Sequence, residues 1–373
     1  MLENMGQSGA PRVIVCCGSG GVGKTTVSAA IGLHGALSGL KTIVLTIDPA
    51  RRLADFMGIG EFPDKAVKVP LHVPEDGSGE LHAMMLDAKR TFDHLISRYA
   101  PRDMQSRIFS NRYYQHLSEN MGGSHEYMAM EKLYEIYQQG EWDLIVLDTP
   151  PSRRALDFLD APERVLNLLG NQYFRRILNP ESRAGKLGGM MFSLVKTPML
   201  KAMSQVVGKR AMEDLFGFFS LFNDALFDGF QQRAKAVESL LSDSVTAFIA
   251  VTTPMAYPMR EAEYFYKRLN ARGMPFHGFI VNRVHRSGDP AAVNALFSEL
   301  EASDLIPSGI VRQLEMSYQQ FQSLAESDKN KIRQLRRDID PGIPVLEIPM
   351  DDGEVCDIGG LLRLRQHLMA SEK

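Results

Sequence analysis

Cysteine is scarce in this chain of 373 residues, which contains only three. Three cysteines cannot form a disulfide framework, and Cys16 and Cys17 are adjacent within an apolar run. The sequence therefore favours a reducing compartment, the cytoplasm. The N-terminal sequence MLENMGQSGAPR has no apolar core, so a secretory signal is not expected there.

Long apolar runs and an excess of basic charge are also missing. No charge-free apolar stretch reaches the length of about 18 residues that a membrane-spanning helix needs, so we expect no integral membrane segment. Lys and Arg together number 42 and Asp and Glu 45, which gives a formal net charge of −3. Nucleic-acid binders carry a basic footprint, so no nucleic-acid partner is expected.

Short β-branched runs separated by helical stretches predict an α/β fold with a doubly wound, mainly parallel sheet. The expected strands are residues 12–18, 41–48, 81–87, 143–149, 245–252, 276–284 and 345–349. Far more residues separate the fourth strand from the fifth than a crossover helix needs. We therefore predict one domain, 1–373, with a core of about 10–87, 141–152 and 244–373. An inserted α-helical subdomain is expected at about 88–140 and 153–243.

The sequence GSGGVGKTT lies between the first predicted strand and a helix rich in small residues. Gly18, Gly23, Lys24 and Thr25 fill the GxxxxGK[ST] pattern of a phosphate-binding loop. Glycines let successive amides point at phosphate oxygens, and the helix N-terminus adds its positive dipole end. The alternative is a glycine-rich turn with a solvated lysine. The predicted nucleotide contacts are Gly18, Ser19, Gly20, Gly21, Val22, Gly23, Lys24, Thr25 and Thr26.

The residue types around this loop predict a Mg²⁺ site. Lys24 is expected to bridge the β- and γ-phosphates, Thr25 to bind Mg²⁺ and Thr26 to reach the α-phosphate. Asp48 and Asp148 end two predicted strands at the ligand-binding edge of such a sheet. Asp148 is placed to hold a Mg²⁺-bound water and Asp48 to orient the attacking water, so both carboxylates would act on the metal through water. The alternative is that each aspartate caps a turn.

The choice of base depends on Asn282, which lies near the end of a predicted strand. Guanine-specific loops use Asn-Lys-x-Asp, whose carboxylate contacts guanine, and the segment Asn282-Arg283-Val284-His285 lacks that carboxylate. An asparagine both donates to and accepts from the edge of adenine. The sequence therefore favours ATP over GTP, and the alternative is that Asn282 caps the strand end.

Five segments carry a close resemblance to one family. They are GSGGVGKTT at 18–26, TIDPARRL at 46–53, DTPPSRRALDFL at 148–159, VNRV at 281–284 and IPMDDGEVCDIGGLLRL at 348–364. These segments resemble the ArsA family of deviant Walker A P-loop ATPases. The family contains the arsenite-pump ATPase and the cytosolic targeting ATPases for tail-anchored membrane proteins.

The resemblance implies a doubly wound sheet capped by a helical subdomain and a homodimer with two ATPs at its interface. It implies that Asp48 activates water, that Asn282 contacts adenine and that Pro349 packs near the base. The chain resembles the prokaryotic single-module members and not the tandem pump.

The chain departs from the family at Ser19, where the family has a lysine that reaches the partner's nucleotide. A hydroxyl cannot replace an ammonium charge at a developing γ-phosphate. We hypothesise that one of four nearby arginines supplies that charge, and the alternative is that they are solvated or ion-paired. Loss of the lysine also leaves open a heterodimer with a lysine-bearing paralogue. The four are Arg51, Arg52, Arg153 and Arg154.

Thiol metal chemistry is a second departure. In the family, the eukaryotic targeting ATPases share zinc through a CxxC pair, and the arsenite pump uses dispersed cysteines. Thiolates are the ligands that such soft metals require. Cys16, Cys17 and Cys356 form neither arrangement, and we interpret them as buried small apolar residues. Arsenite sensing through thiols is therefore not expected.

Methionine is concentrated in one segment, since 11 of the 20 methionines lie within residues 84–212. Met191, Val195, Met199, Met203 and Val206 recur at helical spacing. Methionine adapts to varied apolar partners, so these helices suit a hydrophobic groove. The alternative is that the stripe packs inside the protein.

These features predict a cytoplasmic, Mg²⁺-dependent ATPase that hydrolyses ATP at a dimer interface. Hydrolysis would open and close the helical subdomain around a hydrophobic protein client, such as a tail-anchored membrane protein segment. Two alternatives remain open. One is the ATPase subunit of an arsenite or anion efflux system, which needs a membrane-protein partner, and the other is a positioning ATPase resembling MinD and ParA.

Overall fold

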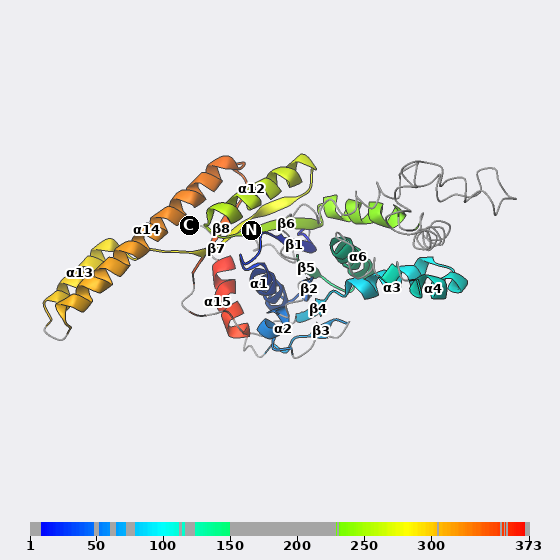
Figure 1. Cartoon of the computed structure of the whole chain (residues 1–373), viewed down its shortest axis with the longest axis horizontal. Helices are drawn as coiled ribbons and strands as arrows, with labels where there is room; N and C mark the ends of the chain where they lie inside the picture. Colours follow the sequence, from blue (N-terminus) through cyan, green and yellow to red (C-terminus); the bar gives the residue numbers. More distant parts are fainter. Residues whose placement is uncertain are drawn as a thin grey trace, which may run out of the picture. The chain divides into compact units, whose positions relative to one another are not determined.

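A computed structural model shows an eight-stranded sheet among the described residues of the chain (Figure 1). The strand order is β3-β4-β2-β5-β1-β6-β7-β8, and every neighbouring pair is parallel except β3 with β4. The predicted α/β fold with a mainly parallel sheet is thus confirmed. The structure describes residues 9–47, 52–59, 65–71, 79–111, 114–115, 124–149, 229, 231–303, 306–350, 353, 355 and 357–369.

All seven predicted strands are present, and their described ends lie within two residues of the expected ones. The additional strand β3 has only two residues, which is too short to show an alternating pattern. The strands are β1 Val13–Cys17, β2 Lys41–Thr46, β3 Val67–Lys68, β4 Glu80–Met85, β5 Leu144–Asp148, β6 Thr246–Thr252, β7 Phe276–Val284 and β8 Val345–Pro349.

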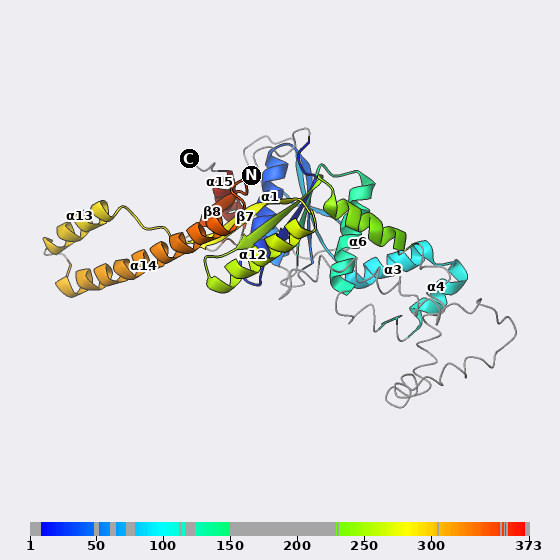
Figure 2. The same ribbon diagram turned by 90° about the horizontal axis from the view of Figure 1, so that it is seen from above.

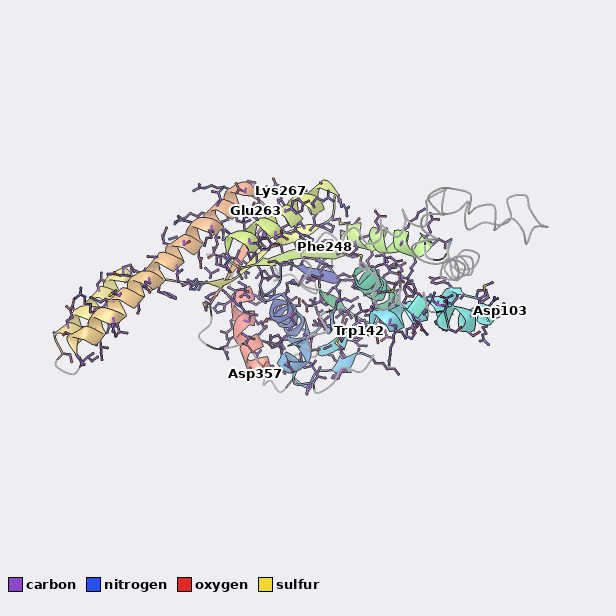
Figure 3. The ribbon with its side chains drawn as sticks, viewed as in Figure 1. Asp103, Trp142, Phe248, Glu263, Lys267 and Asp357 are labelled. Carbon is purple, nitrogen blue, oxygen red and sulfur yellow. The ribbon has the colours of Figure 1, made fainter. Side chains whose placement is uncertain are left out.

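Both faces of the sheet are covered by helices, because successive side chains of a buried strand point to opposite faces. In β6, Ile249 belongs to the apolar core that also includes residues of α1 (Lys24–Leu37), α2 (Arg52–Met57) and α15 (Ile358–Met369). The adjacent Phe248 faces α12 (Ala256–Ala271) and contacts Phe265, with ring centroids 6.3 Å apart (Figure 3). This two-sided covering is the doubly wound arrangement.

Helix α1 lies unusually close to the sheet because its inner face is made of small residues. A Cβ added at Gly32 would lie 2.3 Å from Cγ2 of Val44 on β2. A Cβ at Gly35 would lie 2.5 Å from Cδ2 of Leu144 on β5. Only glycine permits this approach, which brings the second half of α1 close to β2 and β5.

The chain divides into two compact units. Unit 1 comprises Met1–Met85, Gln139–Ala155 and Ser242–Lys373 and contains the sheet, and unit 2 comprises Leu86–Gln138 and Leu156–Leu241. Much of unit 2 lies outside the described residues, including the methionine stripe that begins at Met191. The predicted domain boundaries therefore stay a prediction.

The described part of unit 2 is helical. It contains α3 (Ala88–Tyr99), α4 (Arg102–Phe109), most of α6 (Ser124–Gln139) and a helix within residues 231–242. Ile96 and Met128 lie in its apolar core. Glu131 is buried and accepts a hydrogen bond from Arg233. Burial raises the pKa of Glu131, and the Arg233 guanidinium opposes that shift.

Between β7 and β8 the chain forms α13 (Pro290–Glu301) and the long helix α14 (Ser308–Asp338). We call α13 together with residues 308–325 of α14 the arm. The two helices lie side by side in both Figure 1 and Figure 2. The remainder of α14 contacts α12 and β7. Among the described residues, no helix combines the length and the apolar composition needed to cross a membrane.

Candidate nucleotide-binding site

The glycine-rich loop at residues 18–23 joins β1 directly to α1, as the sequence predicts. Gly21 and Gly23 have φ angles of 78° and 94°, a region that favours glycine. A Cβ at Gly18 would lie 2.1 Å from the carbonyl oxygen of Val251, so a larger residue does not fit there. The loop is therefore curled and closely seated on β6, with the N-terminal amides of α1 at its end.

Lys24 and Ser19 meet inside this loop. The Lys24 ammonium donates a hydrogen bond to the Ser19 carbonyl oxygen at 2.9 Å, and its side chain is only 6% exposed. The Ser19 hydroxyl is buried and has no hydrogen-bond partner among the residues that the structure describes. A buried hydroxyl without a partner costs free energy, so the interior of the loop suits a polar ligand.

Asp148 at the end of β5 is held by two hydroxyl groups. The Thr25 hydroxyl donates to Asp148 Oδ2 at 2.8 Å, and the Thr46 hydroxyl donates to the same oxygen at 2.9 Å. Asp148 is fully buried. Hydroxyl and carboxylate oxygens are the ligands that Mg²⁺ prefers, so Thr25 and Asp148 fit the predicted metal.

Thr46 is a site residue that the sequence analysis missed. It lies at the end of β2, and its hydroxyl donates to Asp148 on the neighbouring strand β5. The available signal was a polar residue at the carboxyl end of a buried strand, where parallel sheets place their ligands.

Asn282 contacts the loop and also the backbone of the next residue in its own strand. Its Nδ2 donates to the carbonyl oxygen of Val22 at 2.9 Å, and its Oδ1 accepts from the backbone N–H of Arg283 at 3.0 Å. A Cβ at Gly23 would lie 2.3 Å from Nδ2, so this amide fills the space beside the loop. Asn282 therefore lies within β7, two residues before its end, and braces the loop from there.

Arg283 is a second residue that the sequence analysis did not assign to the loop. It has a φ of 61°, which is uncommon for a residue other than glycine. Its Nη1 donates to the carbonyl oxygen of Gly21 at 3.3 Å. No simple pattern in the sequence marks this role, because it depends on the left-handed backbone.

Pro349 ends β8 and lies opposite Val284 in the register of β7 and β8. The backbone N–H of Met350 donates to the Val284 carbonyl oxygen at 2.9 Å. The structure thus brings Pro349 to the same sheet edge as the loop, Asp148 and Asn282.

Several predicted residues lie outside the described residues. They are Asp48, Arg51, Arg153 and Arg154, together with the side chain of Arg52. Ile47, just after β2, is the last described residue of that segment. Its backbone N–H donates to the Asp148 carbonyl oxygen at 3.3 Å, so Ile47 lies beside Asp148.

Cys16 and Cys17 are both buried. Burial raises the pKa of Cys16 to about 12 and also raises that of Cys17. Both thiols are thus protonated near neutral pH and are poor metal ligands. Cys356 lies outside the described residues, among which no group of three or more His, Cys, Asp or Glu side chains is placed to hold a metal ion.

Comparison with known proteins shows the family that the sequence motifs resemble. A family model described as "Anion-transporting ATPase" matches residues 11–324. The "ATPase GET3" of Malassezia globosa is 26% identical over 284 residues, covering 76% of this chain and 76% of the relative. The "Putative arsenical pump-driving ATPase 1" of Aquifex aeolicus is 24% identical over 369 residues, covering 97% and 79%. The "ATPase GET3A" of Arabidopsis thaliana is 27% identical over 271 residues, covering 72% and 65%.

Proposed function

The chain belongs to the anion-transporting ATPase family, and on that premise we propose that it couples Mg²⁺-dependent ATP hydrolysis in a cytoplasmic homodimer to the handling of a hydrophobic protein segment. The observation that carries the catalytic part is the hydrogen bonding of Thr25 and Thr46 to Asp148 at the end of the glycine-rich loop. This arrangement joins a phosphate-binding loop to a buried carboxylate suited to Mg²⁺.

The loop and Lys24 would bind the phosphates. The curled main chain of residues 18–23 and the N-terminus of α1 provide amide donors, and Thr26 in the first turn of α1 is the candidate contact for the α-phosphate. The Lys24 ammonium already lies at the loop, where it would exchange the Ser19 carbonyl for the β- and γ-phosphates. Mg²⁺ bound at Thr25 and Asp148 would neutralise charge on those phosphates.

Hydrolysis requires a water molecule in line with the γ-phosphate. We assign its orientation to Asp48, one position beyond the last described residue of that segment. The water oxygen bonds to the γ-phosphorus while the bond to the bridging oxygen breaks. ADP keeps that oxygen, inorganic phosphate leaves, and Asp48 accepts the water proton.

Hydrolysis also requires a positive charge at the γ-phosphate, which the neutral side chain of Ser19 does not supply. We assign it to one of the arginines that follow Asp48 and Asp148, since a guanidinium suits this task. The steady-state ATPase rate of the single variants Arg51→Ala, Arg52→Ala, Arg153→Ala and Arg154→Ala tests this. One of them is expected to lose most activity, and full turnover in all four would exclude the assignment.

Adenine recognition is assigned to Asn282 and Pro349. An asparagine side chain has two amide hydrogens and an oxygen with two lone pairs. Val22 and the backbone of Arg283 engage one hydrogen and one lone pair, so one of each remains for the edge of adenine. Pro349 lies at the same edge, where its ring can pack against the base.

The client proposal rests on the methionine-rich composition of residues 84–212 and on the relatives named ATPase GET3. The relative from Aquifex is named for an arsenical pump, but the buried, protonated Cys16 and Cys17 do not favour metalloid binding. A membrane-positioning role would need a free terminal amphipathic helix. Leu361, Leu364 and Leu368 of α15 instead pack into the core that contains α1.

The catalytic proposal is tested with Asp148→Asn, which keeps the size of the side chain and removes its charge. We expect phosphate release to fall by about 100-fold or more, because the carboxylate supports the metal. Asp143→Asn, an exposed change on the residue preceding the same strand, is the matched control and should retain turnover. Equal rates in the two variants would contradict the metal assignment.

The client proposal is tested by co-purification from the native host in ATP with Asp48→Asn, which would slow hydrolysis and trap the bound state. Recovery of tail-anchored proteins would support client handling. Recovery of only a membrane transporter would overturn it in favour of an efflux system.

A further inference from the structure

The arm begins at the sheet edge that carries the glycine-rich loop. The parallel strands β1 and β7 both end there, β1 leading into the loop and β7 into α13. Both views show α13 and the outer part of α14 leading away from the sheet (Figures 1 and 2). At about 1.5 Å per residue, residues 308–325 extend for roughly 27 Å. The arm therefore projects from the edge that holds the proposed active site.

One face of the arm carries an apolar seam on α14. Its members are separated alternately by four and three residues, which is the spacing of a coiled-coil seam. The four apolar members are between 40% and 50% exposed. A helix with such a seam is typically packed against another helix. The seam consists of Ile310, Leu314, Ser317, Phe321 and Leu324.

The adjoining face of α14 already has a partner within the chain. Tyr318 contacts Phe297 of α13, with ring centroids 5.9 Å apart, and Val311 is buried. The seam itself becomes covered further along the helix, where Asp328 is buried against His285 and Leu335 is buried completely. Only the part of the seam on the arm is left exposed within the described part of the chain.

We propose that this seam pairs with the same seam of a second copy of the chain, the two arms running antiparallel. In the register that centres the twofold axis between Ser317 and Phe321, Leu314 faces Leu324 and Ser317 faces Phe321, each twice by symmetry. A small residue opposite a large one fills the interface evenly. The inference rests on the homodimer of the proposed function and adds the surface that holds it together.

A second copy fits this seam better than an unrelated helix does. From Leu314 to Leu324 the seam is complementary to itself in the antiparallel register, whereas Ile310 lies opposite the covered Asp328, and Gln313 and Gln320 beside the seam bring no like charges together. Two copies that face each other across the loop-bearing edges also bring their arms past each other in opposite directions. We call this pairing of the two arms the arm clasp, and it would connect the two proposed active sites without a shared metal.

Disulfide trapping in the full-length chain tests the register. Gln320 lies on the flank of the seam and would meet the partner's Gln320 at the twofold axis, whereas Gln319 lies on the opposite side of the helix. Both are exposed, so Gln319→Cys is the matched control. Other thiols should not react, because Cys356 is replaced by serine (Cys356→Ser) and Cys16 and Cys17 are buried.

We expect Gln320→Cys to oxidise rapidly to a covalent dimer and Gln319→Cys to form little. Equal crosslinking of the two variants, or no crosslinking of either, would overturn the register.

A second experiment measures the dimer directly by light scattering over a dilution series with ATP. Leu314→Glu combined with Phe321→Glu is expected to raise the dimer dissociation constant about 30-fold or more, because buried apolar anchors dominate such interfaces. Gln319→Glu adds charge on the opposite face and should leave the constant unchanged.

The outcomes separate the arm clasp from the proposed function. An unchanged dimer in the double variant overturns the clasp and leaves the homodimeric ATPase standing. A wild-type chain that is monomeric at every concentration while hydrolysing ATP overturns both. If an apolar tail-anchor peptide shields Gln320→Cys from alkylation in monomeric protein, the seam is a client surface and the clasp is wrong.

Discussion

The glycine-rich loop and the arm leave the same edge of the sheet, but they are stabilised differently. The loop is fixed by hydrogen bonds from Lys24, Asn282 and Arg283 to its own carbonyl oxygens. The arm exposes apolar side chains such as Leu314 and Leu324. Directional bonds within one chain can prepare a site before its ligand arrives, whereas an apolar seam gains its stability only when a second surface covers it. The comparison predicts that loop changes act on nucleotide and arm changes on association.

The largest effect is expected from Lys24→Ala. Removing the ammonium eliminates a charge that the loop holds for the β- and γ-phosphates, so phosphate release should fall about 10³-fold. The midpoint of thermal unfolding should change much less than the rate, since the Lys24 ammonium donates to a carbonyl oxygen of the loop. Lys329→Ala on exposed α14 is the control for loss of one positive charge. Residual turnover within threefold of the parent would contradict the loop assignment.

Leu335→Ala and Leu324→Ala compare the covered and exposed parts of one helix. Leu335 is fully buried, so its truncation should lower the free energy of unfolding by about 2–5 kcal/mol at every protein concentration. Leu324 is 50% exposed in the single chain, so its truncation should have an effect that grows with protein concentration, as dimer stability does. Denaturant titrations at two concentrations measure both. A concentration-independent loss in Leu324→Ala would show that the seam acts within one chain.

The loop was predicted from the sequence, and the arm was not. GSGGVGKTT between a strand and a helix has one common structural solution, so the positions of Gly23, Lys24 and Thr25 followed from it. Thr46 and Arg283 were missed because their roles depend on atoms of distant segments, Asp148 Oδ2 and the Gly21 carbonyl. A heptad spacing shows that a helix has an apolar seam but does not identify what covers it.

The variant Asn282→Ala distinguishes two proposed roles of Asn282, which are to brace the loop and to contact the adenine base. Loss of the bond to the Val22 carbonyl should weaken every ligand that uses the loop, tripolyphosphate included, by about threefold. Loss of the adenine contact should add to this only for ATP, for a total of about tenfold. Binding of ATP, GTP and tripolyphosphate by calorimetry measures both parts. Unchanged tripolyphosphate binding would exclude the brace, and equal losses for all three ligands would exclude the base contact.

The smallest effect is expected from Arg283→Gly, which tests why a strained residue sits beside the loop. Glycine accepts a φ of 61° without steric cost but has more freedom when unfolded, so the free energy of unfolding should change by less than about 1 kcal/mol. The lost bond to the Gly21 carbonyl should still weaken ATP binding about twofold to threefold, since that bond is exposed and long at 3.3 Å. Arg286→Gly removes a similar exposed charge nearby and should leave binding unchanged. If both variants bind ATP like the parent, the guanidinium of Arg283 does not hold the loop, and the hydrogen bond from the Arg283 backbone N–H to Asn282 Oδ1 is left as the contact that accompanies the left-handed backbone.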